Sequence, residues 1–491
     1  MTTLESNATL LKTLEPRKLW EIFGLLLATP RESGHEENIR ARLAELSAAA
    51  GFQCETDVAG NLIIRVPATA GSEKSPTVVL QGHLDMVCTK RADSAHDFAQ
   101  DPIRLVRDGD WLKADGTTLG ADNGLGVAAA LATAFDPEIQ HGPLEILFTV
   151  DEEVGLTGAA GLAPGLLTGR ILLNLDSEET GVIYMGCAGG SGVQTFLPVV
   201  WEELAADHVG LVLKISGLRG GHSGGDIHEN RGNAVKFLAR ALAELREYAR
   251  VVEFTAGDKH NAIPRHGKVH LAVPAHRRAE ALAAVERIRA ELAEEFSKEQ
   301  DFRLALEDAA TPGRVMSAVT TARLVDLLLA IPSGVVAMST DLPGLVETST
   351  SLATVRTADD RVTVHSSPRS SNARALRALG DRLQAISRLA GADSQADEPY
   401  PGWQPDPGSR VVALAEDVHE KIFAVRPKRL AIHAGLECGV IGEKYPDLDM
   451  CSFGPLIVNP HSPDEATSIE SVSVFWRTLK AILAAIASGE Y

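Results

Sequence analysis

The first 185 or so residues alternate short apolar runs with helical patterns. Runs rich in β-branched residues predict strands at Asn61–Val66, Thr77–Leu80, Leu144–Val150 and Ile171–Leu175. Small and apolar residues predict a helix over Gly124–Phe135, and an earlier helix is expected to follow an N-cap at Ser33 and to end at Gly51. Short apolar strands that alternate with helices favour an α/β fold with a mostly parallel central sheet.

The pattern changes near residue 205, where the alternation typical of half-buried strands begins. The elements predicted from there are a strand at Leu211–Ile215, a helix at Asn233–Tyr248, strands at Val251–Thr255 and Lys268–Pro274, a helix at Arg277–Lys298 and a strand at Asp301–Leu306. This β-α-β-β-α-β order is that of a ferredoxin-like unit. A less regular version of the same order is predicted over about residues 320–389, with strands near Leu345–Val355 and Arg361–Ser366. The proline-rich segment Ala392–Ser409 is typical of a linker.

These changes divide the chain into three regions. Residues 1–204 are expected to form the first part of a catalytic α/β domain, and residues 396–491, where α/β character resumes, the second part. Between them, residues 205–395 are expected to form an inserted α+β domain with ferredoxin-like units.

Composition narrows the class of protein. Lys and Arg number 47 against 66 Asp and Glu, a formal net charge of −19, which disfavours nucleic acid as a partner. No apolar run approaches the roughly 20 residues that span a bilayer, and the start of the chain lacks the apolar core of a secretory signal. The five cysteines are widely spaced and form no CxxC pair, which is typical of reduced cysteines in a cytoplasmic protein.

Acidic residues and histidines follow directly after several of the predicted strands. The segments concerned are Gly82–Asp85, Asp151–Glu153, Asp176 after Ile171–Leu175, the turn Gly120–Gly124 with Asp122, and Asn459–Pro463 with His461. In open α/β sheets, binding sites form outside the carboxyl ends of the strands, so these side chains are expected to converge there. Imidazole and carboxylate ligands suit zinc, cobalt or manganese, and a bridging carboxylate lets two cations lie roughly 3.5–4 Å apart.

Neighbouring residues within these segments suggest separate roles in binding metal, orienting a ligand and transferring protons. His83 and Asp85 lie on the same side of an extended segment, so Asp85 can accept from the second ring nitrogen of His83. Glu152 and Glu153 are adjacent and point differently, so one can bind a metal while the other handles protons. Each feature alone is common in proteins without a metal, and it is their joint position at strand ends that predicts a site.

These residues carry a resemblance to a known family. The motifs concerned are Gly82–Val87, Gly120–Gly124, Asp151–Gly155, Asn174–Glu178 and Pro460–Glu465, which resemble the co-catalytic zinc aminopeptidase and carboxypeptidase superfamily. Within it, Gly220–His228, Asn261–Arg265 and His433–Gly439 are similar to the aminoacyl-histidine dipeptidases, the Xaa-His or carnosine-type peptidases of the bacterial cytosol. The resemblance spans nearly the whole chain, and its metal motifs are more specific than its substrate motifs.

The resemblance implies a role for each matched residue. It makes Asp122 the bridging ligand, His83 and Asp176 the other ligands of one metal, and Glu153 and His461 those of the second. It also makes Glu152 the general base, Asp85 the orienting acid and His222 the group that stabilises the oxyanion. Whether His222 serves its own subunit or a partner's stays open. The resemblance further implies that the inserted domain acts as a lid and that the protein pairs as a homodimer.

The expected activity is metal-dependent hydrolysis of short peptides by a metal-bridged hydroxide. The substrates implied are Xaa-His dipeptides such as carnosine, and Zn²⁺ is the favoured metal, with Co²⁺ and Mn²⁺ also tolerated by this ligand set. Arg369 is a candidate for the substrate carboxylate because guanidinium binds carboxylates bidentately, and Asn261 and Gly435 are candidates for the same pocket.

Several alternatives compete with this interpretation. The same metal core would also suit hydrolysis of N-acyl amino acids or tripeptides, and a protein without turnover could still bind metal. Gly221–Gly225 matches the GxSxG pattern around Ser223, but glycines break the approach that a nucleophile elbow needs. Gly124–Ala129 matches a dinucleotide fingerprint, but it follows a polar turn and lies beside Asp122.

Overall fold

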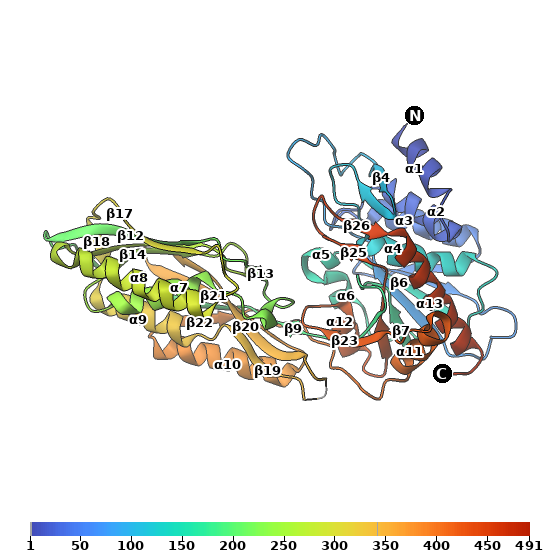
Figure 1. The fold of residues 1–491 in the computed structure, drawn as a ribbon. Helices are drawn as coiled ribbons and strands as arrows, with labels where there is room; N and C mark the ends of the chain where they lie inside the picture. Colours follow the sequence, from blue (N-terminus) through green and yellow to red (C-terminus); the bar gives the residue numbers. More distant parts are fainter. Residues whose placement is uncertain (1, 341) are drawn as a thin grey trace. The chain divides into compact units, whose positions relative to one another are not determined.

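The computed structural model describes residues 2–340 and 342–491, which fold into two compact units (Figure 1). Unit 1 contains residues up to 186 together with 403–431 and 436–491, and unit 2 contains residues 187–402 and 432–435. Among the described residues, no helix is both long enough and apolar enough to cross a membrane.

Unit 1 is built on an eight-stranded sheet with the strand order β1-β2-β6-β3-β7-β24-β8-β23. Its strands are β1 (Gln53–Thr56), β2 (Leu62–Val66), β3 (Val78–His83), β6 (Leu144–Thr149), β7 (Ile171–Asn174), β8 (Val182–Cys187), β23 (Lys428–Ile432) and β24 (Asp449–Ser452). The central strands β6, β3, β7 and β24 run parallel, whereas β2 is antiparallel to β6 and β1 on one side and β8 is antiparallel to β24 on the other. The α/β class is therefore confirmed, and the sheet is mixed with a parallel centre.

Helices pack on this sheet because its central strands bury side chains on both faces. Every residue of β3, β6 and β7 is buried, as expected for strands covered on both sides. Helix α4 packs on β3, α2 on α4, and α11 on β24. The helices of unit 1 are α1 (Thr3–Leu11), α2 (Arg17–Leu27), α3 (Glu37–Ala49), α4 (Ala121–Phe135), α5 (Glu152–Gly155), α6 (Thr157–Gly161), α11 (Arg410–Phe423), α12 (Glu437–Lys444) and α13 (Ile469–Ala487). A small second sheet joins β4 (Leu105–Asp108), β5 (Trp111–Ala114), β26 (Ala466–Ser468) and β25 (Ile457–Val458).

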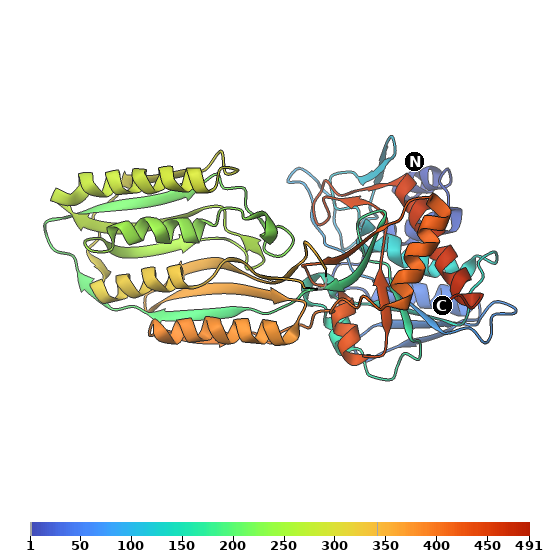
Figure 2. The ribbon, with the colours of Figure 1, turned by 60° about the horizontal axis from the view of Figure 1, so that its bottom comes forward.

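Unit 2 is an antiparallel sheet with its helices on one face (Figures 1 and 2). The long strands are β10 (Val193–Pro198), β12 (His208–Ser216), β14 (Arg250–Ala256), β16 (Gly267–Pro274), β17 (Arg303–Asp308), β19 (Gly334–Met338), β20 (Val346–Thr357), β21 (Arg361–Ser370) and β22 (Asp393–Ala396). The helices are α7 (Ala234–Leu245), α8 (Arg278–Glu295), α9 (Ala318–Ala330) and α10 (Ala373–Leu389). Short elements are β9 (Gly189–Gly190), β11 (Trp201–Glu203), β13 (Gly221–His222), β15 (Ala262–Ile263), β18 (Arg314–Met316), η1 (Ile227–Glu229) and η2 (Ala275–Arg277).

The strand order of unit 2 shows two nested ferredoxin-like units. The first runs β12-α7-β14-β16-α8-β17 and pairs its strands in the order β17-β12-β16-β14. The second, less regular pattern predicted near residues 320–389 also forms a ferredoxin-like unit, from β20, β21, α10 and β22. Helix α9 and strand β10 complete this unit, and β10 precedes the first unit in the chain. Pairing of β14 with β20 joins the two units into one sheet over a shared apolar core.

The structure differs from three details of the sequence analysis. Unit 2 begins at Cys187 rather than at residue 205, because Val193–Pro198 pairs with β21 of that sheet. Unit 2 continues to Gly402, and part of the expected linker forms strand β22 beside β10. Ser33 does not cap α3, whose N-cap position is Glu36, and its hydroxyl instead donates to Asp85 Oδ2 at 2.8 Å.

The core of unit 2 predicts a mutational cost. Leu213 on β12 is fully buried, so L213A should destabilise the protein by roughly 2–5 kcal/mol through lost burial and a cavity. L389A is the control, because Leu389 is 88% exposed and its truncation should change the free energy of unfolding by less than about 0.5 kcal/mol. Chemical denaturation of both variants measures the difference, and equal costs would contradict the assigned packing.

Candidate metal and substrate site

Parallel strands bring the predicted acidic segments of unit 1 to one edge of the sheet. His83, the last residue of β3, pairs with Thr149 at the end of β6, and Gln81 pairs with Asn174 at the end of β7. Asp151–Glu153 begin two residues after the end of β6, and Asp176 lies two residues after the end of β7. The carboxyl ends of these strands therefore present His83, Glu152, Glu153 and Asp176 together.

A turn at the start of α4 presents Asp122 to the same edge. Gly120 takes a left-handed conformation with φ +71°, and neither Asp122 nor Asn123 has helical backbone angles. The Asn123 side chain donates to the carbonyl of Leu175 at 2.7 Å, which ties the turn to the end of β7. Asp122 consequently lies outside the helix proper, with its carboxylate directed at the histidines.

The five predicted metal ligands lie together in two groups that share Asp122. Asp122 Oδ1 is 3.1 Å from His83 Nε2, and Asp122 Oδ2 is 3.2 Å from His461 Nε2. His83 Nε2 is also 3.3 Å from Asp176 Oδ1, and His461 Nε2 is 3.0 Å from Glu153 Oε2. In each group, one candidate ligand atom per residue lies within 4.8 Å of the others. One carboxylate facing two such groups is the arrangement that a pair of cations requires.

The protein atoms alone leave this cluster incompletely satisfied. Glu153 Oε1 and Asp176 Oδ1 are buried and accept no hydrogen bond from the described residues. Burial is the main cause that raises the pKa of Asp176 to about 6, and the charges of Asp122 and Glu153 add to it. Burial together with nearby carboxylates also raises the pKa of Glu152. Because unpaired buried carboxylates are costly, the donor set fits divalent cations.

Asp85 connects His83 of one group to Glu153 of the other group and to the neighbouring Glu152. Its Oδ1 lies 3.3 Å from His83 Nδ1 and accepts from the backbone N–H of Glu152 at 3.1 Å. Its Oδ2 accepts from the N–H of Glu153 and from the hydroxyl of Ser33. The hydrogen bonds to His83 and Ser33 outweigh burial and keep the pKa of Asp85 below its usual value. Asp85 therefore stays ionised between His83 and the start of α5, a position that permits the predicted orienting role.

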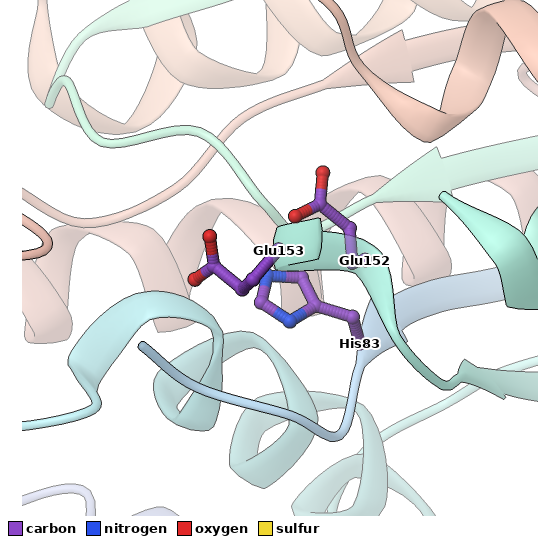
Figure 3. A group of neighbouring side chains, drawn as sticks. All are labelled: His83, Glu152 and Glu153. Atoms are coloured by element: carbon purple, nitrogen blue, oxygen red, sulfur yellow. The ribbon is translucent and has the colours of Figure 1, made fainter. Parts of the chain in front are cut away.

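Glu152 and Glu153 leave the first turn of α5 in different directions (Figure 3). Glu153 belongs to the group with Asp122 and His461, whereas Glu152 is grouped only with His83 and Glu153. This geometry permits the predicted division, with Glu153 as a ligand and Glu152 free to exchange a proton. The roles of all these residues stay predictions.

The predicted substrate residues of unit 2 gather around the turn at His222. The backbone N–H groups of Gly225 and Gly224 donate to His222 Nδ1 at 2.9 and 3.3 Å. The backbone carbonyl of Asn261 accepts from the N–H of Ser223 at 2.9 Å. A Cβ placed on Gly224 would lie 3.2 Å from both Arg369 Cδ and His222 Cε1.

Arg369 lies beside two residues that the sequence analysis did not single out. Its guanidinium donates to the hydroxyl of Tyr400 at 2.7 Å, and its Nε is buried with no hydrogen-bond partner among the described residues. The Tyr400 ring also lies next to Gly435, where an added Cβ would be 3.2 Å from Tyr400 Cε2. Tyr400 falls in the segment Ala392–Ser409 that was expected to be a linker, and no sequence pattern marks it. His433 lies in the motif His433–Gly439, but the sequence indicates no role for it. His433 Nε2 lies 2.7 Å from the hydroxyl of Ser349.

Ser223 has no feature of a catalytic nucleophile. Its hydroxyl is fully buried and has no hydrogen-bond partner among the described residues, so no base activates it there. The GxSxG match is therefore a coincidence of the glycine-rich turn.

Comparisons with known proteins find similarity to peptidases. Residues 79–485 match the sequence profile of peptidase family M20/M25/M40. The chain is 43% identical over 480 residues to the cytosol non-specific dipeptidase of Escherichia coli (strain K12), covering 96% of this chain and 98% of that protein. It is also similar to the crystal structure of aminoacylhistidine dipeptidase from Vibrio alginolyticus, with TM-score 0.88, 42% identity, and 97% and 98% of the two chains covered. Human carnosine dipeptidase 1, with TM-score 0.51, 13% identity and 99% of each chain covered, shares the fold.

The buried histidines of unit 2 predict how stability depends on pH. Burial, followed by the charge of Arg369, lowers the pKa of both His222 and His433 to about 4. In the unfolded chain these histidines titrate near 6.5, so between about pH 6.5 and 4 the unfolded state binds more protons. Their contribution to the free energy of unfolding is complete above about pH 6.5 and is lost as the pH falls toward 4, by at most roughly 1.4 kcal/mol per pKa unit for each histidine.

Denaturant unfolding of the metal-free protein between pH 7.5 and 4.5 measures this dependence. H433Q removes one of the two groups and should flatten the slope, whereas H276Q, at an exposed histidine, is the control and should leave it unchanged. A slope that is equal in wild type and H433Q would show that His433 is not held neutral by its surroundings.

Proposed function

The chain belongs to peptidase family M20/M25/M40, and we propose that it is a metal-dependent dipeptidase whose substrates include Xaa-His dipeptides such as carnosine. The observation that carries the proposal is the pair of ligand groups that share Asp122. The carboxylate of Glu152 belongs to neither of these two groups but lies close to a residue of each, His83 and Glu153. The high identity to two dipeptidases over nearly the full length of each chain supports the same activity.

We propose that five residues hold two divalent ions, with Zn²⁺ favoured and Co²⁺ or Mn²⁺ compatible with the same ligands. His83, Asp122 and Asp176 would hold one ion, and Asp122, Glu153 and His461 the other, because these are the groups whose donor atoms lie together. When bound, such a pair of ions would polarise a carbonyl group and lower the pKa of a bound water molecule.

Glu152 is the proposed general base. Its carboxylate belongs to neither of the two ligand groups that share Asp122, yet it lies within 4.8 Å of ligand atoms of His83 and Glu153, one from each group, so it can exchange a proton with a molecule held there. Glu152 takes the proton from the attacking water and returns it to the leaving amine. Asp85 keeps Glu152 in place through its hydrogen bond to the Glu152 backbone.

His222 is the proposed donor to the oxyanion, on the strength of its own hydrogen bonds. Because Nδ1 accepts from Gly224 and Gly225, the ring proton resides on Nε2. The pKa of about 4 keeps the ring neutral at physiological pH, so Nε2–H remains a donor without adding a charge that would have to be buried. A donor fixed in this tautomer suits the charge that develops on the peptide carbonyl oxygen.

Arg369 is the proposed anchor for the free carboxylate of the substrate. Its guanidinium is mostly buried, is held by the Tyr400 hydroxyl and retains an unpartnered Nε. A buried cation with a free donor binds a carboxylate in preference to an uncharged group. Asn261 and Gly435 are proposed to line the same pocket.

The remaining expectations concern partners and location. We propose a cytoplasmic protein that acts on small peptides, in agreement with the name of the Escherichia coli relative. The homodimer, the lid role of unit 2 and the absence of nucleic-acid and membrane partners stay predictions of the sequence.

The central test is hydrolysis with and without the base. Purified protein loaded with Zn²⁺ or Mn²⁺ should hydrolyse Gly-His and carnosine, and removal of the metal with a chelator should abolish the activity. E152Q should lower kcat by at least about 10³-fold while two ions per chain remain bound, because it removes proton transfer and leaves the ligands intact.

Two comparisons make this test specific. E153Q, at the adjacent residue, should instead reduce metal content, which separates the ligand from the base. Tripeptides and N-acetyl amino acids are the competing substrates, and faster turnover of either would replace the dipeptidase assignment. Wild-type protein that binds two ions and hydrolyses none of these would be a metal-binding protein without turnover.

A second test concerns the substrate carboxylate. R369M should raise KM for Gly-His by roughly 10–100-fold with a smaller effect on kcat, because a charge-assisted hydrogen bond contributes about 1.5–3 kcal/mol. The same variant should hardly change KM for the C-terminal amide of Gly-His, which lacks the carboxylate. An equal loss for both substrates would exclude Arg369 as the anchor.

A further inference from the structure

A carboxylate outside the ligand set holds the turn that presents Asp122. Glu465 is buried, and its two oxygens accept hydrogen bonds from four consecutive backbone N–H groups. Oε2 accepts from Leu119 and Gly120 at 2.7 and 2.9 Å, and Oε1 accepts from Ala121 and Asp122 at 2.8 and 3.3 Å. A single side chain therefore satisfies every backbone donor from residue 119 to residue 122.

A buried arginine holds the carbonyl groups of the same turn. Arg31 is 2% exposed, and its guanidinium donates to the carbonyl of Gly120 at 2.5 Å. It also donates to the carbonyls of Leu84 and Asp85, at 2.9 and 2.8 Å, in the segment that follows β3. Arg31 thus joins the Asp122 turn to the segment that carries Asp85, next to His83.

The position of Glu465 connects a third segment to this arrangement. His461 lies four residues earlier in the same loop, and its Nε2 is 3.2 Å from Asp122 Oδ2. The Glu465 carboxylate and the Arg31 guanidinium attract each other, which offsets part of the cost of burying each charge. The two side chains consequently fix the backbone of three segments that meet at Asp122.

We propose that Glu465 and Arg31 are positioning residues that set the separation and orientation of the two ligand groups through the Asp122 turn. The inference rests on the proposed function, because it concerns how the proposed metal ligands are held. Backbone N–H groups that face a carboxylate cannot rotate away as a side chain can, so the turn keeps Asp122 directed at both histidines before an ion arrives. Removing such support typically costs 10–100-fold in metal affinity.

The test compares Glu465 with another buried carboxylate that binds backbone amides far from the metal ligands. Glu145 is 3% exposed and accepts from the N–H groups of Thr168 and Gly169 at 2.8 and 2.9 Å. It pairs with Val79 at the start of β3, four residues before His83 and so about 13 Å away along the strand. E145Q therefore imposes the same chemical change on unit 1 without touching the Asp122 turn.

Metal affinity is measured on the full-length protein by competition with a chromophoric chelator for Zn²⁺. E465Q should bind at least one of the two ions at least 10-fold more weakly, and its hydrolysis of Gly-His should recover as Zn²⁺ is raised. E145Q should lower the unfolding temperature but leave both affinities within about twofold of wild type. E465D and E145D repeat the comparison with a milder change, in case E465Q does not fold.

The outcomes separate this inference from the proposed function. If wild type binds no pair of ions, the proposed function fails first. If wild type binds two ions and hydrolyses dipeptides but the Glu465 variants bind as tightly as wild type, the positioning role is overturned alone. Equal losses of affinity in the Glu465 and Glu145 variants would likewise overturn it, because the effect would then follow general stability.

Discussion

Repulsion among buried carboxylates is the constraint on which the rest of unit 1 depends. Asp122, Asp176, Glu152 and Glu153 meet at the carboxyl ends of the central strands, where water screens their charges poorly. The raised pKa values of Asp176 and Glu152 express the cost of that crowding. Cations would relieve it, and so the side chains that repel one another are the same side chains that are able to hold metal ions.

The surrounding structure resists this repulsion mainly with backbone groups. Asp85 accepts from two N–H groups at the start of α5, and Glu465 accepts from four at the start of α4. Each is itself a carboxylate whose hydrogen bonds favour the charged form. At Asp85 they outweigh burial and keep the pKa low, whereas at Glu465 they oppose the increase in pKa that burial causes. The acidic cluster is therefore flanked by two further carboxylates whose oxygens are satisfied by backbone hydrogen bonds.

Much of the fold and the composition of the metal cluster could be predicted, because both leave a local mark in the sequence. Apolar runs marked β3, β6 and β7, and His83, Glu153 and Asp176 stand at the ends of those strands or within four residues after them. The β-α-β-β-α-β order likewise followed from alternation and helical periodicity alone. The roles of the clustered side chains rest on resemblance and chemistry.

Residues that act over long sequence separations could not be predicted in this way. Glu465 binds amides more than 340 positions earlier, and Arg31 binds carbonyls on two distant segments, so no spacing reveals either. Strand β22 was interpreted as part of a linker because several prolines follow it closely in the sequence. It forms a strand by pairing with β10, which lies about 200 residues earlier in the chain. Ser33 resembled a helix cap because serine often is one, whereas its hydroxyl is taken by Asp85.

The parallel pairing of β7 with β24 has a consequence for biosynthesis. β7 ends at Asn174 and its partner begins at Asp449, with all of the long strands of unit 2 encoded between them. During synthesis on the ribosome, unit 2 can complete its sheet before β24 has been made. The edge of β7 that pairs with β24 therefore stays unpaired and exposed while residues 175–448 are synthesised. The nascent chain is thus most prone to aggregate in the interval that ends when β24 emerges, and a chaperone that shields strand edges would have its largest effect then.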